Sequence, residues 1–226
     1  MISPMDADFQ YFYEKEGFGP ADHTQLVPAE KIHRFRGKLP DQLLKYWEMY
    51  GWSGYGSGRL WVVDPDVYEP VMRAWLANTP FLEQDLFYVI ARGAFGRLFL
   101  WGTRSGPSIE INSPWGTIFP RDNSVAIRAG RADTILRYFF SKFTKERLDQ
   151  QDSLRRPLFE RAVKALGPLL PNEMYGFEPA LVLGGKADLK NLNRVDAVQH
   201  LTILAQLGDR KIMRDIAADA RNAGLV

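Results

Sequence analysis

Four short apolar runs follow one another in the middle of the chain, and they constrain the fold more than any other feature. Residues 87–91, 97–101, 108–111 and 116–119 are rich in aromatic and β-branched side chains, and Gly, Pro or Asn-Ser turns separate them. Runs of this length with turn residues between them predict β-strands joined by short connections, which pair antiparallel. We therefore expect an antiparallel meander, with residues 59–63 as a further strand.

Helical periodicity dominates outside these runs. Apolar spacing and flanking Pro or Gly predict helices over residues 40–50, 66–76, 133–143, 157–166, 195–207 and 210–220, and residues 179–183 predict one more strand. Because helices and strands segregate along the chain, the expected fold class is α+β, an antiparallel sheet with helices packed on it and a helical C-terminal part. A length of 226 residues suits one domain or two, and we place a boundary between regions 1–105 and 106–226.

The composition excludes several kinds of site. The chain has no cysteine, which removes disulfides, thiolate metal ligands and thiol nucleophiles. Its three histidines lack the spacing of a metal-binding pair, so we expect neither a metal nor a cofactor. Residues 86–101 form the richest apolar stretch, but two arginines interrupt it and it is too short to cross a membrane. With no secretory signal in residues 1–6, we expect a cytoplasmic protein.

No catalytic motif stands out. Residues 54–58 are as rich in glycine as a phosphate-binding loop, but they precede the expected strand instead of following one. Residues 183–186 follow an expected strand, yet Ala187 stands where a P-loop has the hydroxyl that binds magnesium. We therefore predict no catalytic residues and no enzymatic activity.

Charge is distributed unevenly, although the formal net charge is only +2. Residues 1–30 hold six acids against one lysine, residues 61–90 hold five acids against one arginine, and residues 121–166 hold eleven Lys and Arg against six acids. Acid-rich segments favour a surface that meets a cationic partner. The carboxylates predicted at such a partner-binding surface are Asp6, Asp8, Asp64, Asp66, Glu69, Glu83 and Asp85.

Lasting affinity also needs apolar anchors, because charge mainly speeds the encounter of two proteins. Trp52 and Tyr55 lie in a glycine-rich segment that we expect to be a loop, where nothing requires burial. They are therefore candidate anchors, and Tyr11 and Tyr175 are further ones. The competing explanation for Trp52 and Tyr55 is that the loop packs onto its own domain.

Two stretches resemble known families. Residues 36–47, Arg-Gly-Lys-Leu-Pro-Asp-Gln-Leu-Leu-Lys-Tyr-Trp, continue through Gly-Trp-Ser-Gly-Tyr-Gly at 51–56 to Asn78 and resemble the GAD-like domain. Their pattern of Leu-Pro, an aromatic helix and glycine is also similar to the SUKH superfamily of bacterial immunity proteins. Residues 158–169, 172–177 and 179–207 resemble the domain of unassigned function that commonly follows a GAD-like domain.

The resemblance implies a function. Proteins with this pairing resemble immunity proteins encoded beside DNase effectors of type VI secretion systems, which bind the toxin inside the producing cell. We expect the partner to be such a cognate DNase, with no direct contact to nucleic acid or membrane. The alternative is a nucleic-acid-associated binding module, favoured by the basic excess of residues 121–166. A hydrolase that uses two carboxylates is the third and weakest hypothesis.

Overall fold

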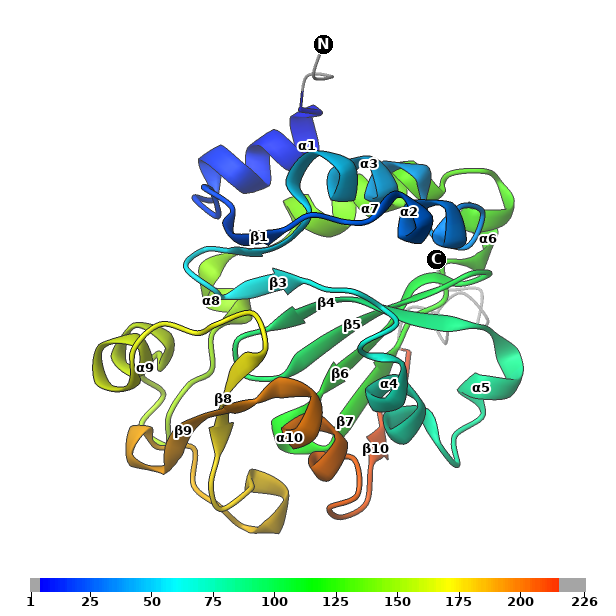
Figure 1. Cartoon of the computed structure of the whole chain (residues 1–226). Coiled ribbons are helices and arrows are strands. Elements are labelled where there is room, and N and C mark those ends of the chain that lie inside the picture. The colour runs from blue at the N-terminus through cyan, green and yellow to red at the C-terminus, as the bar shows by residue number, and fades with distance from the viewer. Residues whose placement is uncertain (1–4, 216–226) are drawn as a thin grey trace, which may run out of the picture.

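An eight-stranded sheet forms the centre of the computed structural model, which describes residues 5–215 (Figure 1). The strand order is β1-β2-β3-β4-β5-β6-β7-β10, and every neighbouring pair is antiparallel except β7 and β10, which are parallel. This confirms the predicted α+β class. The strands are β1 Asp22–Gln25, β2 Trp52–Tyr55, β3 Leu60–Val62, β4 Phe87–Gly93, β5 Arg97–Gly102, β6 Gly106–Asn112, β7 Thr117–Pro120 and β10 Lys211–Ile212.

Both faces of the central strands are buried, which explains their continuous apolar sequences. In β5, Leu98 and Leu100 point to one hydrophobic cluster while Phe99 and Trp101 point to the other. Successive side chains of a strand alternate between the two faces, so a strand covered on both sides needs apolar residues at every position. The sheet is therefore the middle of three layers.

Helices from residues 7–50 and from residues 124–148 cover the upper face in Figure 1. They are α1 Ala7–Gln10, the π-helix η1 Tyr11–Lys15, α2 Ala29–Phe35, α3 Asp41–Tyr50, α6 Ser124–Arg128, α7 Ala132–Ser141 and α8 Lys145–Leu148. Aromatic rings fill this layer: Phe9 of α1 lies 5.2 Å from Phe140 of α7 between ring centroids. The chain segment after the sheet thus packs directly on the first helix.

The lower face carries a mixed layer. It holds α4 Glu69–Leu76, α5 Phe81–Gln84, α9 Phe159–Leu166, the hairpin of β8 Glu173–Phe177 and β9 Leu192–Asp196, α10 Ala197–Leu204, and the 3-10 turns η2 Ser113–Trp115, η3 Leu181–Leu183 and η4 Leu189–Asn191. The buried Trp75 Nε1 of α4 donates a hydrogen bond of 3.0 Å to the carbonyl of Leu201 in α10. Within residues 5–215, no helix has the length and apolar character that crossing a membrane requires.

Two element predictions are wrong. Residues 179–183 are not a strand, because η3 turns there and ends at Gly184, which has a φ of 88°. The helix expected over 210–220 is replaced at its start by β10, while residues 216–220 lie outside the described part. Strand β7 has a free edge, and the amides of Lys211 and Met213 donate to its side at 2.8 Å each. Pairing with that edge outweighs the helical spacing of the sequence.

Other differences concern boundaries. The strands β1, β2, β8 and β9 were not expected, and the helix predicted over 195–207 begins only after Asp196. That carboxylate caps α10 by accepting a hydrogen bond of 2.9 Å from the amide of Gln199. The boundary proposed at residue 105 falls in the turn between β5 and β6, which pair along their length, so the sheet continues across it.

Candidate functional site

Three of the predicted carboxylates lie together on the connection from β3 to α4. We call residues 64–69, which contain Asp64, Asp66 and Glu69, the acidic segment. Asp64 Oδ1 accepts a hydrogen bond of 3.0 Å from the amide of Asp66, which closes a turn around Pro65. Glu69 then begins α4. The local sequence therefore holds the three carboxylates on a turn and the helix start that follows it.

Basic side chains of α2 neutralise much of this charge. Lys31 Nζ donates to Asp64 Oδ2 at 2.9 Å and also pairs with Asp66, while Arg34 pairs with Asp66 at 3.0 Å. Burial lowers the pKa of Lys31, but its hydrogen bonds and charge interactions with Asp66 and Asp64 outweigh burial and raise that pKa overall. Glu69 pairs with Arg73 at 2.8 Å. The segment is thus a paired network, and its long-range attraction for cations is weaker than the sequence suggests.

A hollow of about 340 Å³ lies on one side of the acidic segment. Its walls include Trp52, Trp61, Val67, Tyr68, Pro171 and Val198, and we call it the tryptophan hollow. Val67 is 54% exposed, and the buried Nε1 of Trp52 has no hydrogen-bond partner in the described part of the chain. Apolar walls with a few polar groups are typical of surfaces that receive a side chain of a partner.

A second hollow of about 210 Å³ lies on the other side. Its lining includes Arg34, Asp66, Glu69, Leu82, Leu86 and Tyr88, and we call it the leucine hollow. Leu86 is 65% exposed. The acidic segment therefore runs between two concave patches that expose apolar side chains, and this combination is the candidate functional site.

The other predicted acids do not join this group. Asp6 caps α1 by accepting from the amide of Phe9 at 3.1 Å, and it also accepts from Gln42 Nε2 and Tyr46 Oη at 3.2 and 2.5 Å. Asp8 is half-buried on the same helix, and Glu83 is exposed on α5. Asp85 is buried and holds the turn after β5. Asp6 and Asp85 therefore serve the chain's own structure.

The four aromatic candidates lie in different environments. Tyr55 lies in the upper core, 5.5 Å from Phe12 between ring centroids, and burial raises its pKa. Tyr175 lies in the lower core, where its hydroxyl donates to the carbonyl of Gly167 at 2.6 Å and burial raises its pKa to about 12. Trp52 is half-buried, and Tyr11 is 46% exposed on η1. The expected loop is strand β2, and burial in β2 and β8 makes Tyr55 and Tyr175 inaccessible to a partner.

One residue beneath the tryptophan hollow, Arg92, was not predicted from the sequence. Arg92 of β4 is fully buried, and its guanidinium lies 5.2 Å from the ring centroid of Trp61. Its Nε donates to Tyr68 Oη and its Nη2 to the carbonyl of Pro171, both at 2.7 Å. An arginine within an apolar strand could have indicated such a role, because a buried cation needs several hydrogen-bond acceptors. Here those acceptors belong to two walls of the hollow.

Comparison with known proteins gives two family matches. The GAD-like domain matches residues 9–115, and the C-terminal domain of the T6SS immunity protein Tdi1 matches residues 133–208. The predicted pairing is confirmed. No curated protein matches the chain. A solved structure described as the crystal structure of Atu4351 from Agrobacterium tumefaciens is similar, with a TM-score of 0.80 and 23% identity over 92% of this chain and 91% of that one, which shows a shared fold.

Proposed function

We propose, from the premise that this chain combines a GAD-like domain with the C-terminal domain of the T6SS immunity protein Tdi1, that it binds and inhibits a toxic DNase. The C-terminal match supports a type VI secretion immunity protein. The DNase target is our inference from the resemblance found in the sequence. The protein would act in the cytoplasm of the producing cell and occlude the active site or DNA-binding groove of the toxin. This role needs a binding surface and no catalytic residue.

The observation that carries the proposal is the construction of the tryptophan hollow. Trp52, Trp61 and Val67 belong to the GAD-like match, whereas Pro171 and Val198 belong to the C-terminal match. The hydrogen bond from Arg92 to Pro171 joins the two parts beneath it. A partner seated there would contact both families at once, which gives the pairing of the two domains a functional reason.

The contact chemistry follows from the charge pairs. A nuclease groove that attracts phosphate is cationic, and Asp64, Asp66 and Glu69 offer it carboxylates at the edge of the hollows. Because these acids already pair with Lys31, Arg34 and Arg73, we assign most of the affinity to apolar contacts in the hollows. The acids then contribute to the specificity and rate of association.

The nucleic-acid alternative is weakened by the way the basic residues pair. Arg97 and Arg147 both contact Glu110, at 3.3 and 3.4 Å. Arg156 and Arg161 contact the buried Asp152, at 2.8 and 2.7 Å. Three of the eleven basic residues of 121–166, Arg147, Arg156 and Arg161, therefore pair with carboxylates of the same chain. Salt-sensitive binding of duplex DNA by the purified protein would nevertheless favour this alternative.

The proposal predicts that a neighbouring open reading frame encodes a nuclease, and the test uses that protein as the binding partner. Val67→Asp places an unpaired carboxylate in the tryptophan hollow, and we expect the Kd for the nuclease to rise by about tenfold or more. Val125→Asp is the matched control, because Val125 is 66% exposed on α6 and lines neither hollow. Calorimetry and survival of cells that express the nuclease give the readouts. Equal affinities of the two variants would remove the hollow from the interface, and no affinity for wild type would contradict inhibition of that nuclease.

A further inference from the structure

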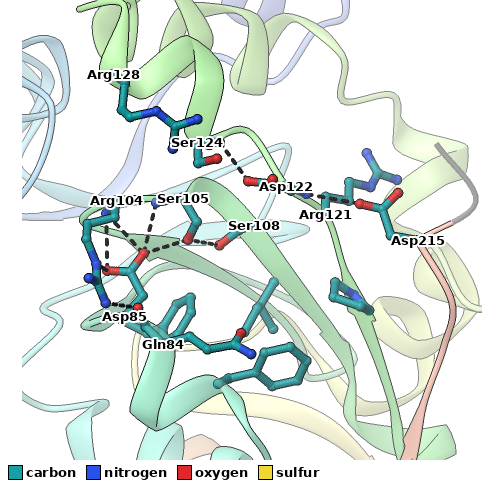
Figure 2. A pocket seen from close by; sticks show the side chains of 14 residues that line it. Gln84, Asp85, Arg104, Ser105, Ser108, Arg121, Asp122, Ser124, Arg128 and Asp215 are labelled. Atoms are coloured by element: carbon teal, nitrogen blue, oxygen red, sulfur yellow. Dashed lines mark hydrogen bonds and ion pairs between the residues drawn. The ribbon is translucent and has the colours of Figure 1, made fainter. Parts of the chain in front are cut away.

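A third concavity lies apart from the tryptophan hollow, between α5, the turn joining β5 to β6, the end of β7 and α6 (Figure 2). We call it the arginine cleft, after Arg104, Arg121 and Arg128 in its lining. Its volume is about 490 Å³, which lies in the range of sites for small molecules. Phe81, Phe87, Ile109 and Pro120 supply an apolar lining.

The hydroxyl groups of Ser105 and Ser108 form a hydrogen-bonded network with the buried carboxylate of Asp85. Ser105 Oγ donates to Asp85 Oδ2 at 2.6 Å, so the bond of 2.7 Å between the two serine hydroxyls must be donated by Ser108. Asp85 also accepts from the amides of Arg104 and Ser105, at 3.0 and 2.9 Å. Figure 2 shows this network against one wall. Asp85 therefore presents little free charge to a ligand.

The two aspartates on the opposite side are engaged as well. Asp122 Oδ1 accepts from the amide of Ser124 at 2.8 Å, and Asp215 Oδ2 accepts from the amide of Asp122 at 3.0 Å. Both carboxylates thus stabilise the chain where β7 leads into α6. Both residues line the cleft, and one oxygen of each carboxylate accepts a backbone amide.

The arginines are more available. Arg104 lies 3.8 Å from Asp85, whereas Arg121 and Arg128 form no ion pair with any residue between 5 and 215. Both side chains are exposed, and Figure 2 shows them on different sides of the opening. Next to Arg121, burial and repulsion from Arg147 and Arg121 lower the pKa of Lys142 to about 8. Cations that disfavour one another in this way indicate a positive local potential.

We infer that the arginine cleft binds a small organic anion, a phosphate monoester or a carboxylate carried on an apolar or aromatic body. Arg121 and Arg128 pair with the anionic group, since guanidinium matches both oxyanions in geometry. The phenylalanine rings and Ile109 contact the body. The cleft shares no residue with the tryptophan hollow, and it adjoins the leucine hollow through Asp85 and Phe87, which line both.

Calorimetry on the full chain tests the inference with phenyl phosphate and benzoate as probes. Inorganic phosphate and phenol serve as controls that carry only the anion or only the ring. We expect one of the two probes to bind more tightly than either control, and the stronger probe identifies the preferred oxyanion. Arg128→Ala should weaken that binding by about tenfold, because it removes a charge-assisted hydrogen bond.

Arg131→Ala is the matched control, since Arg131 is an exposed arginine three residues away that does not line the cleft. Its affinity for the probe should equal that of wild type, and both variants should keep the wild-type circular dichroism spectrum. The inference fails if neither probe binds. It also fails if Arg128→Ala and Arg131→Ala bind the probe with equal affinity. A third contrary result is that benzoate does not bind while inorganic phosphate binds as tightly as phenyl phosphate.

Discussion

Replacing Asp85 tests how the turn after β5 is held. The side chain of Asp85 is 3% exposed, and it accepts hydrogen bonds from Thr103 Oγ1 at 2.7 Å and Ser105 Oγ at 2.6 Å. The amides of Leu86, Arg104 and Ser105 donate to it at 2.8 to 3.1 Å. Asp85→Ala leaves these donors unsatisfied, and three of them are amides that cannot move away.

The expected loss follows from those bonds. A hydrogen bond to a charged group contributes about 1.5–3 kcal/mol, and removing one partner of a buried charged network costs about 3–5 kcal/mol because the contributions are not additive. We expect Asp85→Ala to lower the free energy of unfolding by that amount. For a chain of this size, each kcal/mol lowers Tm by about 2–4 °C, so Tm should fall by about 6–20 °C.

Urea unfolding at several pH values provides the assay, with Glu83→Gln as the control. Glu83 is an exposed acid two residues before Asp85. The free energy of unfolding of its variant should stay within about 0.5 kcal/mol of wild type. Burial raises the pKa of Asp85, but the hydrogen bonds from Ser105, Thr103 and the backbone outweigh burial and lower it overall. The stabilising contribution is therefore complete above the unfolded-state pKa of about 4 and declines as the pH falls through the lower folded-state pKa. Equal stability of Asp85→Ala and Glu83→Gln at neutral pH would refute the reasoning.

Three further predictions concern the candidate site and the core. Glu69→Lys should change the free energy of unfolding by less than about 0.5 kcal/mol, because its pair with Arg73 is exposed, yet slow association with the nuclease in stopped-flow measurements at low salt. Asp66→Lys should cost about 1–3 kcal/mol in urea unfolding, since Arg34 loses its partner and Lys31 keeps only Asp64 and faces a new positive charge. Tyr175→Phe should cost about 0.5–1.5 kcal/mol and leave the Kd for the nuclease unchanged, because only the bond to Gly167 is lost. A stable Asp66→Lys variant would contradict the paired network, and weaker nuclease binding by Tyr175→Phe would contradict its internal role.

The sequence predicts the central meander because its strands carry their own signal. Residues 98–101 are apolar at every position, and Gly96 and Gly102 bound the strand on its two sides. Strand β1 has the sequence Asp-His-Thr-Gln and lies at the sheet edge with three of its four side chains exposed, so no hydrophobic pattern marks it. Strand β10 has two exposed residues and forms only because the edge of β7 is free. Edge strands of this kind depend on their neighbours more than on their own sequence.

The candidate site could be predicted only in part for a similar reason. The proximity of Asp64, Asp66 and Glu69 follows from their spacing, but their pairing with α2 joins residues more than thirty positions apart. The glycine-rich segment predicted a loop, whereas Gly54 lies in β2 because the ring of Trp61 packs 3.0 Å from where a Cβ would stand. That close packing on the neighbouring strand favours glycine, while Tyr55 is buried in the cluster on the opposite face, against Phe12. Composition alone does not distinguish such a glycine from one in a flexible loop.

The three-layer arrangement has a consequence for how such proteins can diversify. The segment matched by the Tdi1 C-terminal domain covers both faces of one sheet, since α7 packs on α1 and α3 above while α10 packs on α4 below. A gene fusion that exchanged only this segment would have to fit two separate cores at once. If the proposed function holds, we expect new partner specificities to arise more readily through point substitutions on the exposed surface than through recombination of the two halves. We therefore expect the two matched segments to be inherited together.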